Sequence, residues 1–176
     1  MHKPLSKKEI KELNKKTREY IAPDLEIVLL LQDVTDPVNV GSFFRLADAA
    51  NVSRIVMTNN TPTPPNPRIS MTSRGLERRI TWQYFEKAED AIEQIRKDGF
   101  DIVAVELTPT SQNYSKIKYK KKTCLILGNE ASGVYKKILN LCDLSVHIPM
   151  LGKGPSLNVN MAASIVVYEI VSQFTL

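Results

Sequence analysis

The chain has 176 residues, 43% of them hydrophobic, and a formal net charge of +5 with a sequence pI of about 9.2. This length suits one compact domain, and no apolar run approaches the roughly 20 residues that a membrane-spanning helix needs. The first twenty residues are charged throughout and lack the apolar stretch of a secretion signal. We therefore expect a cytoplasmic protein with no membrane association.

Positive charge is concentrated in two segments. Residues 1–20 carry seven basic and three acidic side chains, and residues 116–122 carry five lysines and no acid. Such clusters favour a polyanionic partner, since each phosphate that they neutralise releases counterions. When charge alone is considered, a solvated lysine-rich surface is the commoner explanation.

The first expected element is a short basic amphipathic helix at about residues 6–20. Ser6 and Glu9 have the spacing of a capping box, and apolar residues then recur at helical intervals. Residues 25–31 are apolar apart from Glu26, which is typical of a strand covered on both faces of a parallel sheet. A helix and then a strand are expected to follow it.

That helix is expected to start after the Asp36-Pro37 turn and to end near Asn51, and it has one apolar side. A strand at residues 54–58 follows it. Residues 59–68 contain four prolines and are expected to form a long loop.

The rest of the chain continues to alternate between helical and strand patterns. The expected elements are a short helix at 69–76, a strand at 80–85, a helix from Ala88 to Asp98, a strand at 101–107, a loop at 109–119, a strand at 123–127, a helix at 135–141, a strand at 145–149 and a helix at 157–174. This alternation predicts an α/β fold: a mostly parallel sheet with helices on both faces, in a single domain spanning 1–176.

The final helix, residues 157–174, is apolar nearly all round. A surface helix would have one polar face, so this helix lies either in the core or in a contact between two copies. We expect the second arrangement, a homodimer formed through this C-terminal helix.

Three loops that follow expected strands are unusually polar. The loop after Leu31 leads to Asn39 and Arg45, the second spans residues 128–133, and the third spans residues 150–158. In open parallel sheets, ligands sit beyond the carboxyl ends of the strands, so these loops form the expected site. Ser156 is expected to cap the last helix.

Two common nucleotide-binding motifs are excluded. Gly128 and Gly133 have the glycine spacing of a P-loop, but Val134 stands where a P-loop requires lysine. Gly152 and Gly154 lack the third glycine of the dinucleotide fingerprint. The sequence supports neither ATP hydrolysis nor NAD chemistry, and is compatible with a cofactor recognised by the backbone of glycine-containing loops.

No metal or nucleophile site is expected. His147 stands in an apolar strand, where a structural role is commoner than catalysis. Cys124 and Cys142 lie in apolar segments without paired spacing and are expected to be small buried hydrophobes.

The polar loops contain three ordered motifs. Residues 39–45 read NVGSFFR, residues 127–133 read LGNEASG, and residues 148–150 and 156–159 read IPM and SLNV. Together they resemble the motifs of the SpoU (TrmH-like) ribose 2′-O-methyltransferases of the SPOUT superfamily, across roughly residues 25–172. The resemblance implies methylation of a ribose 2′-hydroxyl in tRNA or rRNA with S-adenosylmethionine as cofactor. It also implies a C-terminal trefoil knot and a homodimer with the RNA site between subunits.

Site residues follow from the resemblance position by position. It implies that Arg45 is the catalytic arginine and that Asn39 orients it or the substrate. The other implied catalytic residues are Glu130, Ser156 and Asn158. The implied cofactor-binding residues are Leu107, Leu127, Gly128, Asn129, Ile148, Met150, Ser156 and Leu157.

The role of Arg45 stays open at this point. A ribose hydroxyl loses its proton as the methyl bond forms, but arginine, with a pKa above about 12, is a poor base. Arg45 could instead stabilise the developing alkoxide or orient a phosphate that takes the proton. Two positions depart from the family pattern: Ala131 stands where glycine is usual, and Asn160 replaces a small residue.

RNA contacts are expected from the basic segments, together with Arg68, Arg74, Arg78 and Arg79. The residues that we select as RNA-binding are Lys7, Lys11, Arg74, Lys120 and Lys121.

Three alternatives stay open: a non-catalytic RNA-binding protein with the same fold, a base-methylating enzyme of the same superfamily, and a flavodoxin-like signalling domain. The last would use Asp33 or Asp36 and would leave the other two loops unexplained.

Overall fold

A computed structural model describes residues 3–175 of the chain. Its centre is a seven-stranded sheet with the order β3-β2-β1-β6-β4-β7-β5, in which every pair of neighbouring strands is parallel. The strands are β1 (Glu26–Gln32), β2 (Arg54–Thr58), β3 (Trp82–Phe85), β4 (Asp101–Val105), β5 (Gln112–Asn113), β6 (Lys122–Leu127) and β7 (Leu144–His147).

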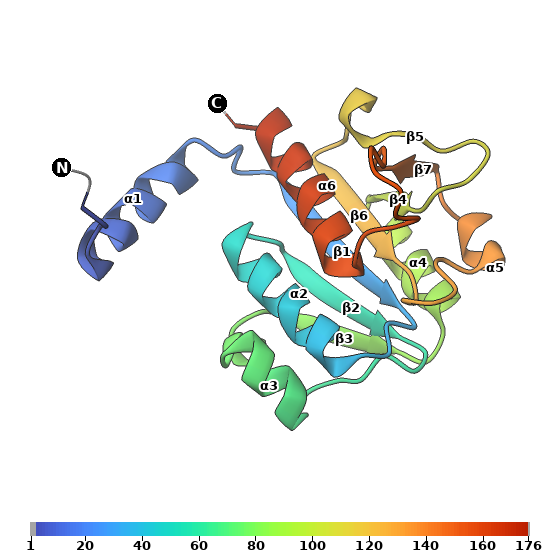
Figure 1. The fold of residues 1–176 in the computed structure, drawn as a ribbon, viewed down its shortest axis with the longest axis horizontal. Helices are drawn as coiled ribbons and strands as arrows, with labels where there is room; N and C mark the ends of the chain where they lie inside the picture. Colours follow the sequence, from blue (N-terminus) through green and yellow to red (C-terminus); the bar gives the residue numbers. More distant parts are fainter. Residues whose placement is uncertain (1–2, 176) are drawn as a thin grey trace.

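Helices cover both faces of this sheet (Figure 1). One face packs against α2 (Pro37–Ala49), α3 (Pro67–Ser73) and α6 (Val159–Gln173), and the other against α4 (Ala88–Lys97) and α5 (Lys136–Leu139). The predicted α/β fold, with a parallel sheet between two helical layers, is therefore confirmed.

The apolar run of β1 is divided between the two layers. Ile27, Leu29 and Leu31 belong to the cluster under α2 and α6, whereas Val28 and Leu30 belong to the cluster over α4 and α5. Successive side chains of a strand point to opposite faces, so a central strand covered on both sides has no polar alternation.

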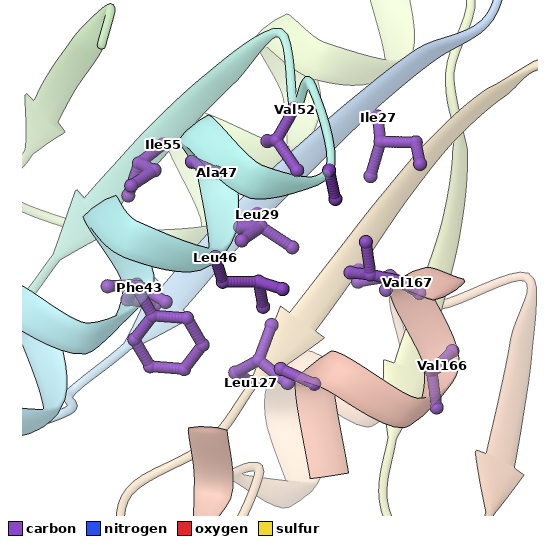
Figure 2. Close-up of a cluster of buried hydrophobic side chains, with 14 of the residues drawn as sticks. Ile27, Leu29, Phe43, Leu46, Ala47, Val52, Ile55, Leu127, Val166 and Val167 are labelled. Atoms are coloured by element: carbon purple, nitrogen blue, oxygen red, sulfur yellow. The ribbon is translucent and has the colours of Figure 1, made fainter. Parts of the chain in front are cut away.

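The larger cluster joins α2 and α6 to the centre of the sheet. Figure 2 shows the side chains that meet there, among them Leu29, Phe43, Leu46, Ala47, Leu127, Val166 and Val167. Fully burying one such large side chain contributes about 1.5–3 kcal/mol, so this cluster fixes where both helices lie on the sheet.

The start of α2 is set by local sequence. Asp36 caps the helix, since its Oδ1 accepts the Val38 N–H at 3.0 Å, and Pro37 occupies the first turn. Gly41 then lets α3 approach closely, because a Cβ there would lie 2.7 Å from Thr72 Cβ. Because α2 begins shortly after β1 ends, its first turn lies at the carboxyl edge of β1.

Several expected boundaries differ from the structure. The helix expected at 69–76 ends at Ser73, because Arg74 and Gly75 both have positive φ, and a 3-10 turn η1 (Leu76–Arg78) follows it. The expected loop at 109–119 contains the edge strand β5 and a second 3-10 turn, η2 (Tyr114–Lys116).

The expectation that Ser156 caps the last helix is wrong. Helix α6 begins at Val159 and its cap is Asn158, whose Oδ1 accepts the Asn160 N–H at 2.9 Å. Ser156 lies in the preceding loop.

The basic helix α1 (Lys7–Glu19) stands apart from the sheet (Figure 1). Its capping box forms as expected, with Ser6 N donating to the Glu9 carboxylate at 2.7 Å. None of its residues is buried. Among residues 3–175, no helix combines the length and the apolar character that a membrane crossing requires.

Candidate active site

A cavity of about 610 Å³ opens at the carboxyl edge of the sheet. Its walls come from the segments that follow β4, β6 and β7 and from the first turns of α6. All eight residues predicted to bind the cofactor line this cavity: Leu107, Leu127, Gly128, Asn129, Ile148, Met150, Ser156 and Leu157. The structure thus brings the second and third polar loops together, and direct contact of these residues with a cofactor stays a prediction.

The loop after β6 is a tight hairpin. Asn129 and Gly133 exchange backbone hydrogen bonds of 3.1 and 2.9 Å. The turn is so close that a Cβ at Gly128 would lie 2.2 Å from the carbonyl carbon of Gly133. Asn129 Oδ1 also accepts the Ala131 and Ser132 N–H groups at 2.9 and 3.0 Å. These bonds fix the hairpin that presents Glu130.

Glu130 joins this hairpin to the first turn of α2. Its carboxylate accepts the backbone N–H groups of Thr35 and Asp36, both at 3.1 Å, and the Asn39 Nδ2 at 2.8 Å. A negative group at the start of a helix is also favoured by the helix dipole. Glu130 therefore holds the loop after β1 and the loop after β6 in one arrangement.

The hydrogen bonds keep Glu130 ionised. Partial burial acts to raise the pKa of its carboxyl, but the bonds from Asn39, Thr35 and Asp36 outweigh burial and hold the pKa below the usual range. At neutral pH, Glu130 is consequently a hydrogen-bond acceptor and not an acid.

Asn39 connects all three polar loops. Its Nδ2 donates to Glu130, and its Oδ1 accepts from Asn158 Nδ2 at 3.2 Å and from Asn160 Nδ2 at 3.0 Å. Asn39 is 9% exposed, whereas Glu130 and Asn158 line the cavity. Residues from the three motifs thus converge through one buried amide.

With this geometry in place, comparison with known proteins assigns the family. The model of the SpoU rRNA methylase family matches residues 26–168. The chain belongs to the SpoU rRNA methylase family. The match covers the whole sheet and most of α6, and leaves α1 outside.

Individual relatives agree with this assignment. The chain is 32% identical to an uncharacterized tRNA/rRNA methyltransferase of Borreliella burgdorferi, over 85% of this chain and 65% of that protein. It is 31% identical to the tRNA (guanosine(18)-2′-O)-methyltransferase of Thermus thermophilus, over 84% of this chain and 74% of that protein.

Among solved structures, the AdoMet-bound rRNA methyltransferase from Sinorhizobium meliloti is similar to it, with a TM-score of 0.78 and 29% identity over 86% of this chain and 57% of that one. The chain therefore spans between 57% and 74% of the length of these three relatives.

The SpoU arginine of the first motif lies outside this cavity. Within residues 3–175, the cavity lining does not include Arg45, which is exposed on α2. Six residues separate it from Asn39, which corresponds to about 9 Å along a helix and about 120° around it.

Helix α6 exposes two large side chains, Met161 and Tyr168, which are 60% and 50% exposed. The Tyr168 hydroxyl reaches the Ala49 carbonyl at the end of α2.

Among the cavity residues that were not selected from the sequence, two are titratable. Glu106 follows β4; its carboxylate accepts the Val134 N–H at 2.8 Å and the Leu107 N–H at 3.0 Å. His147, expected to be structural, lines the cavity, and its Nδ1 lies 3.0 Å from Ser111 Oγ. The position of Glu106 at a strand's carboxyl end was the available signal, because ligands in open sheets gather there.

The residues selected for RNA binding belong to three separate parts of the fold. Lys120 and Lys121 precede β6 at the amino edge of the sheet, opposite the cavity, where they pair with Asp101 at 2.7 Å and Asp24 at 2.8 Å. Lys7 and Lys11 lie on α1, and Arg74 lies at the end of α3. Their contacts with RNA stay predictions.

The two cysteines offer no reactive thiolate. Burial raises the pKa of both thiols, that of Cys142 to about 12. Among residues 3–175, no three His, Cys, Asp or Glu side chains are grouped as metal ligands.

Proposed function

We propose that this SpoU-family protein transfers the methyl group of S-adenosylmethionine to a ribose 2′-hydroxyl of tRNA or rRNA. The observation that carries the proposal is the Asn39 amide, which links Glu130 and Asn158 beside the cavity. The activity of the Thermus relative, 2′-O-methylation of a tRNA guanosine, supports the same chemistry.

The cavity suits the cofactor. Its volume of about 610 Å³ lies within the range of small-molecule sites. Leucine and isoleucine side chains offer apolar cover for an adenine ring, and the backbone of the 128–133 hairpin offers polar contacts for its edge. The carboxylates of Glu106 and Glu130 offer negative charge beside a sulfonium or an ammonium group. S-Adenosylmethionine, when bound, supplies an electrophilic methyl group.

The chain's own residues prepare the acceptor. Guanidinium groups stay protonated in proteins, so an arginine does not take the hydroxyl proton. Arg45 orients an RNA phosphate that takes the proton, or it stabilises the oxygen as negative charge develops on it while the proton passes to solvent. Glu130 and Asn39 hold the start of α2, the helix that carries Arg45, against the cofactor loops.

The position of Arg45 supports a site built from two copies of the chain. Arg45 is exposed on α2, which packs beside α6, and α6 presents Met161 and Tyr168 to the surface. A homodimer formed through α6 would cover these side chains and bring Arg45 of one copy toward the cavity of the other. Ser156, at the cavity rim, is then close to the acceptor ribose.

We extend the proposal to the whole chain. Residues 1–176 form a single domain whose C-terminal loops contain the trefoil knot typical of the superfamily, as family membership supports. The basic α1 and Arg74 contact the RNA away from the reacting ribose, and the protein acts in the cytoplasm, where its substrate is found.

Transfer of labelled methyl groups tests this function. The protein is incubated with methyl-labelled S-adenosylmethionine and total tRNA or rRNA, and the RNA is then digested with alkali. A 2′-O-methyl group blocks cleavage at its own linkage, so we expect the label in alkali-resistant dinucleotides. Label in mononucleotides would identify a base methyltransferase, and no incorporation would identify a non-catalytic RNA-binding protein; both outcomes contradict the proposal.

A further inference from the structure

Asn160, in the first turn of α6, contacts the buried Asn39 amide. Its Nδ2 donates to Asn39 Oδ1 at 3.0 Å, beside the bond of 3.2 Å from Asn158 Nδ2 to the same oxygen. Asn39 Oδ1 therefore accepts two amide donors.

The Glu130 carboxylate determines the orientation of the Asn39, Asn158 and Asn160 side-chain amides. The ionised carboxylate only accepts hydrogen bonds, so the Asn39 NH₂ group must face it. The Asn39 oxygen then faces α6, and both amides there must present their NH₂ groups to it. Reversing any one amide would place two oxygens or two NH₂ groups together.

The two donors on α6 differ in what else they do. Asn158 also caps α6, because its Oδ1 accepts the Asn160 N–H at 2.9 Å. The Oδ1 of Asn160 is buried and has no hydrogen-bond partner within residues 3–175. A buried acceptor without a partner destabilises a fold, so stability alone does not account for an amide at this position.

We propose that Asn160 is a positioning residue for methyl transfer: it fixes the Asn39 amide and, through it, the orientation of Glu130 and the first turn of α2. The inference rests on the proposed function. It predicts that Asn160 acts on the placement of α2, the helix that carries Arg45, and less on cofactor binding itself. A misplacement of about 1 Å at such a site can cost about 100-fold in rate.

Asn160→Asp is the sharpest test, since it keeps the shape of the side chain. An ionised aspartate cannot donate to Asn39 and repels its oxygen, whereas a protonated one can donate again. We expect the single-turnover rate of methyl transfer at pH 8 to fall about 10- to 100-fold. Affinity for S-adenosylhomocysteine, measured by calorimetry, should change by less than about threefold, which is under 1 kcal/mol.

The pH profile separates positioning from a general loss of structure. The ratio of the Asn160→Asp rate to the wild-type rate should rise as the pH is lowered toward the range in which residue 160 gains a proton. Glu130, which contacts the same Asn39, has a lowered pKa, so it loses its charge at a lower pH than an ordinary glutamate does. Asn140→Asp, at the exposed C-cap of α5, is the matched control and should retain the wild-type rate and profile.

A double-mutant cycle tests the contact without cofactor or RNA. Asn39→Ala, Asn160→Ala and the double variant are compared by equilibrium unfolding. We expect the effect of Asn160→Ala on the unfolding constant to shrink at least about threefold when Asn39 is already alanine, because groups in contact are not additive. Asn160→Ser should recover part of the Asn160→Ala loss in rate, because its hydroxyl can also donate.

Each outcome is decisive. Additive unfolding effects, or a wild-type rate and pH profile in Asn160→Asp, would overturn the inference. If the wild-type protein transfers no methyl group, the proposed function fails, and the positioning role fails with it; the unfolding cycle then still reports whether the Asn39–Asn160 bond exists.

Discussion

Asn39 and Glu130 lie 91 residues apart in the chain, yet Asn39 Nδ2 donates to Glu130 Oε1 at 2.8 Å. This bond ties the helix that carries Arg45 to the hairpin that lines the cavity. Because the Asn39 oxygen is bonded at the same time to the start of α6, one amide connects the three polar loops.

Glu130→Gln should abolish most methyl transfer. The glutamine keeps one acceptor and brings an NH₂ group against backbone N–H groups and the Asn39 NH₂, so the start of α2 loses its anchor. We expect a rate reduction of about 100-fold or more, of the size seen when a site loses one fixed polar contact. Rates are compared under single turnover. Glu86→Gln, at an exposed position between β3 and α4, is the control. An equal loss of rate in that variant would show that the effect is not specific to Glu130.

The same variant should alter stability in acid. The folded-state pKa of Glu130 lies below its ordinary value of 4.5, so its stabilisation is fully present above pH 4.5 and is lost as the pH falls through the folded-state pKa. The difference in unfolding free energy between wild type and Glu130→Gln should therefore shrink below pH 4.5. Urea unfolding at a series of pH values measures it, and a difference that stays constant would show that the carboxylate is not stabilised by these bonds.

Gly133→Ala should damage the cofactor loop. Gly133 has a φ of +65°, and a Cβ there would lie 2.2 Å from the Glu106 carboxylate, which itself anchors the loop through Val134 N–H. We expect affinity for S-adenosylhomocysteine to fall at least about tenfold, equivalent to about 1.4 kcal/mol. Gly99→Ala also has a positive φ but an open environment far from the cavity, and it should leave binding unchanged.

Arg45→Ala should abolish turnover and leave cofactor binding largely intact, because Arg45 lies outside the cavity of its own chain. Calorimetry with S-adenosylhomocysteine and the methyl-transfer assay separate the two effects. A variant with unchanged activity would remove Arg45 from the site.

Mixing two inactive variants tests whether the site needs two copies. Arg45→Ala keeps the cavity, and Gly128→Val keeps Arg45 but fills the 128–133 turn, where even a Cβ is too close to Gly133. A mixed dimer contains one site with both parts, so remixing should restore up to about a quarter of wild-type activity if chains pair at random. No recovery from chains that do exchange would mean that Arg45 acts on its own cavity.

The sequence predicted the sheet because β1 and β6 are continuous apolar runs, and it predicted the convergence of the polar loops because they follow parallel strands. It did not predict the cap of α6. Ser156 and Asn158 are equally good cap residues in isolation, and the choice depends on the contact of Asn158 with Asn39.

Sequence patterns also could not predict which side chains pair when they are distant in the chain. The lysines at 120 and 121 resemble an RNA-binding run, yet their partners Asp101 and Asp24 are distant in sequence and adjacent only in the folded sheet. Glu106 was missed for a similar reason, since its role depends on the left-handed Gly133 that approaches it.

The most direct test of the account is a map of 2′-O-methylated nucleotides in cellular RNA with and without this protein. We predict that at least one tRNA or rRNA position loses its 2′-O-methyl group when the protein is absent. Wild-type protein should restore that position, and the Glu130→Gln variant should not. An unchanged map in the absence of the protein would contradict the account.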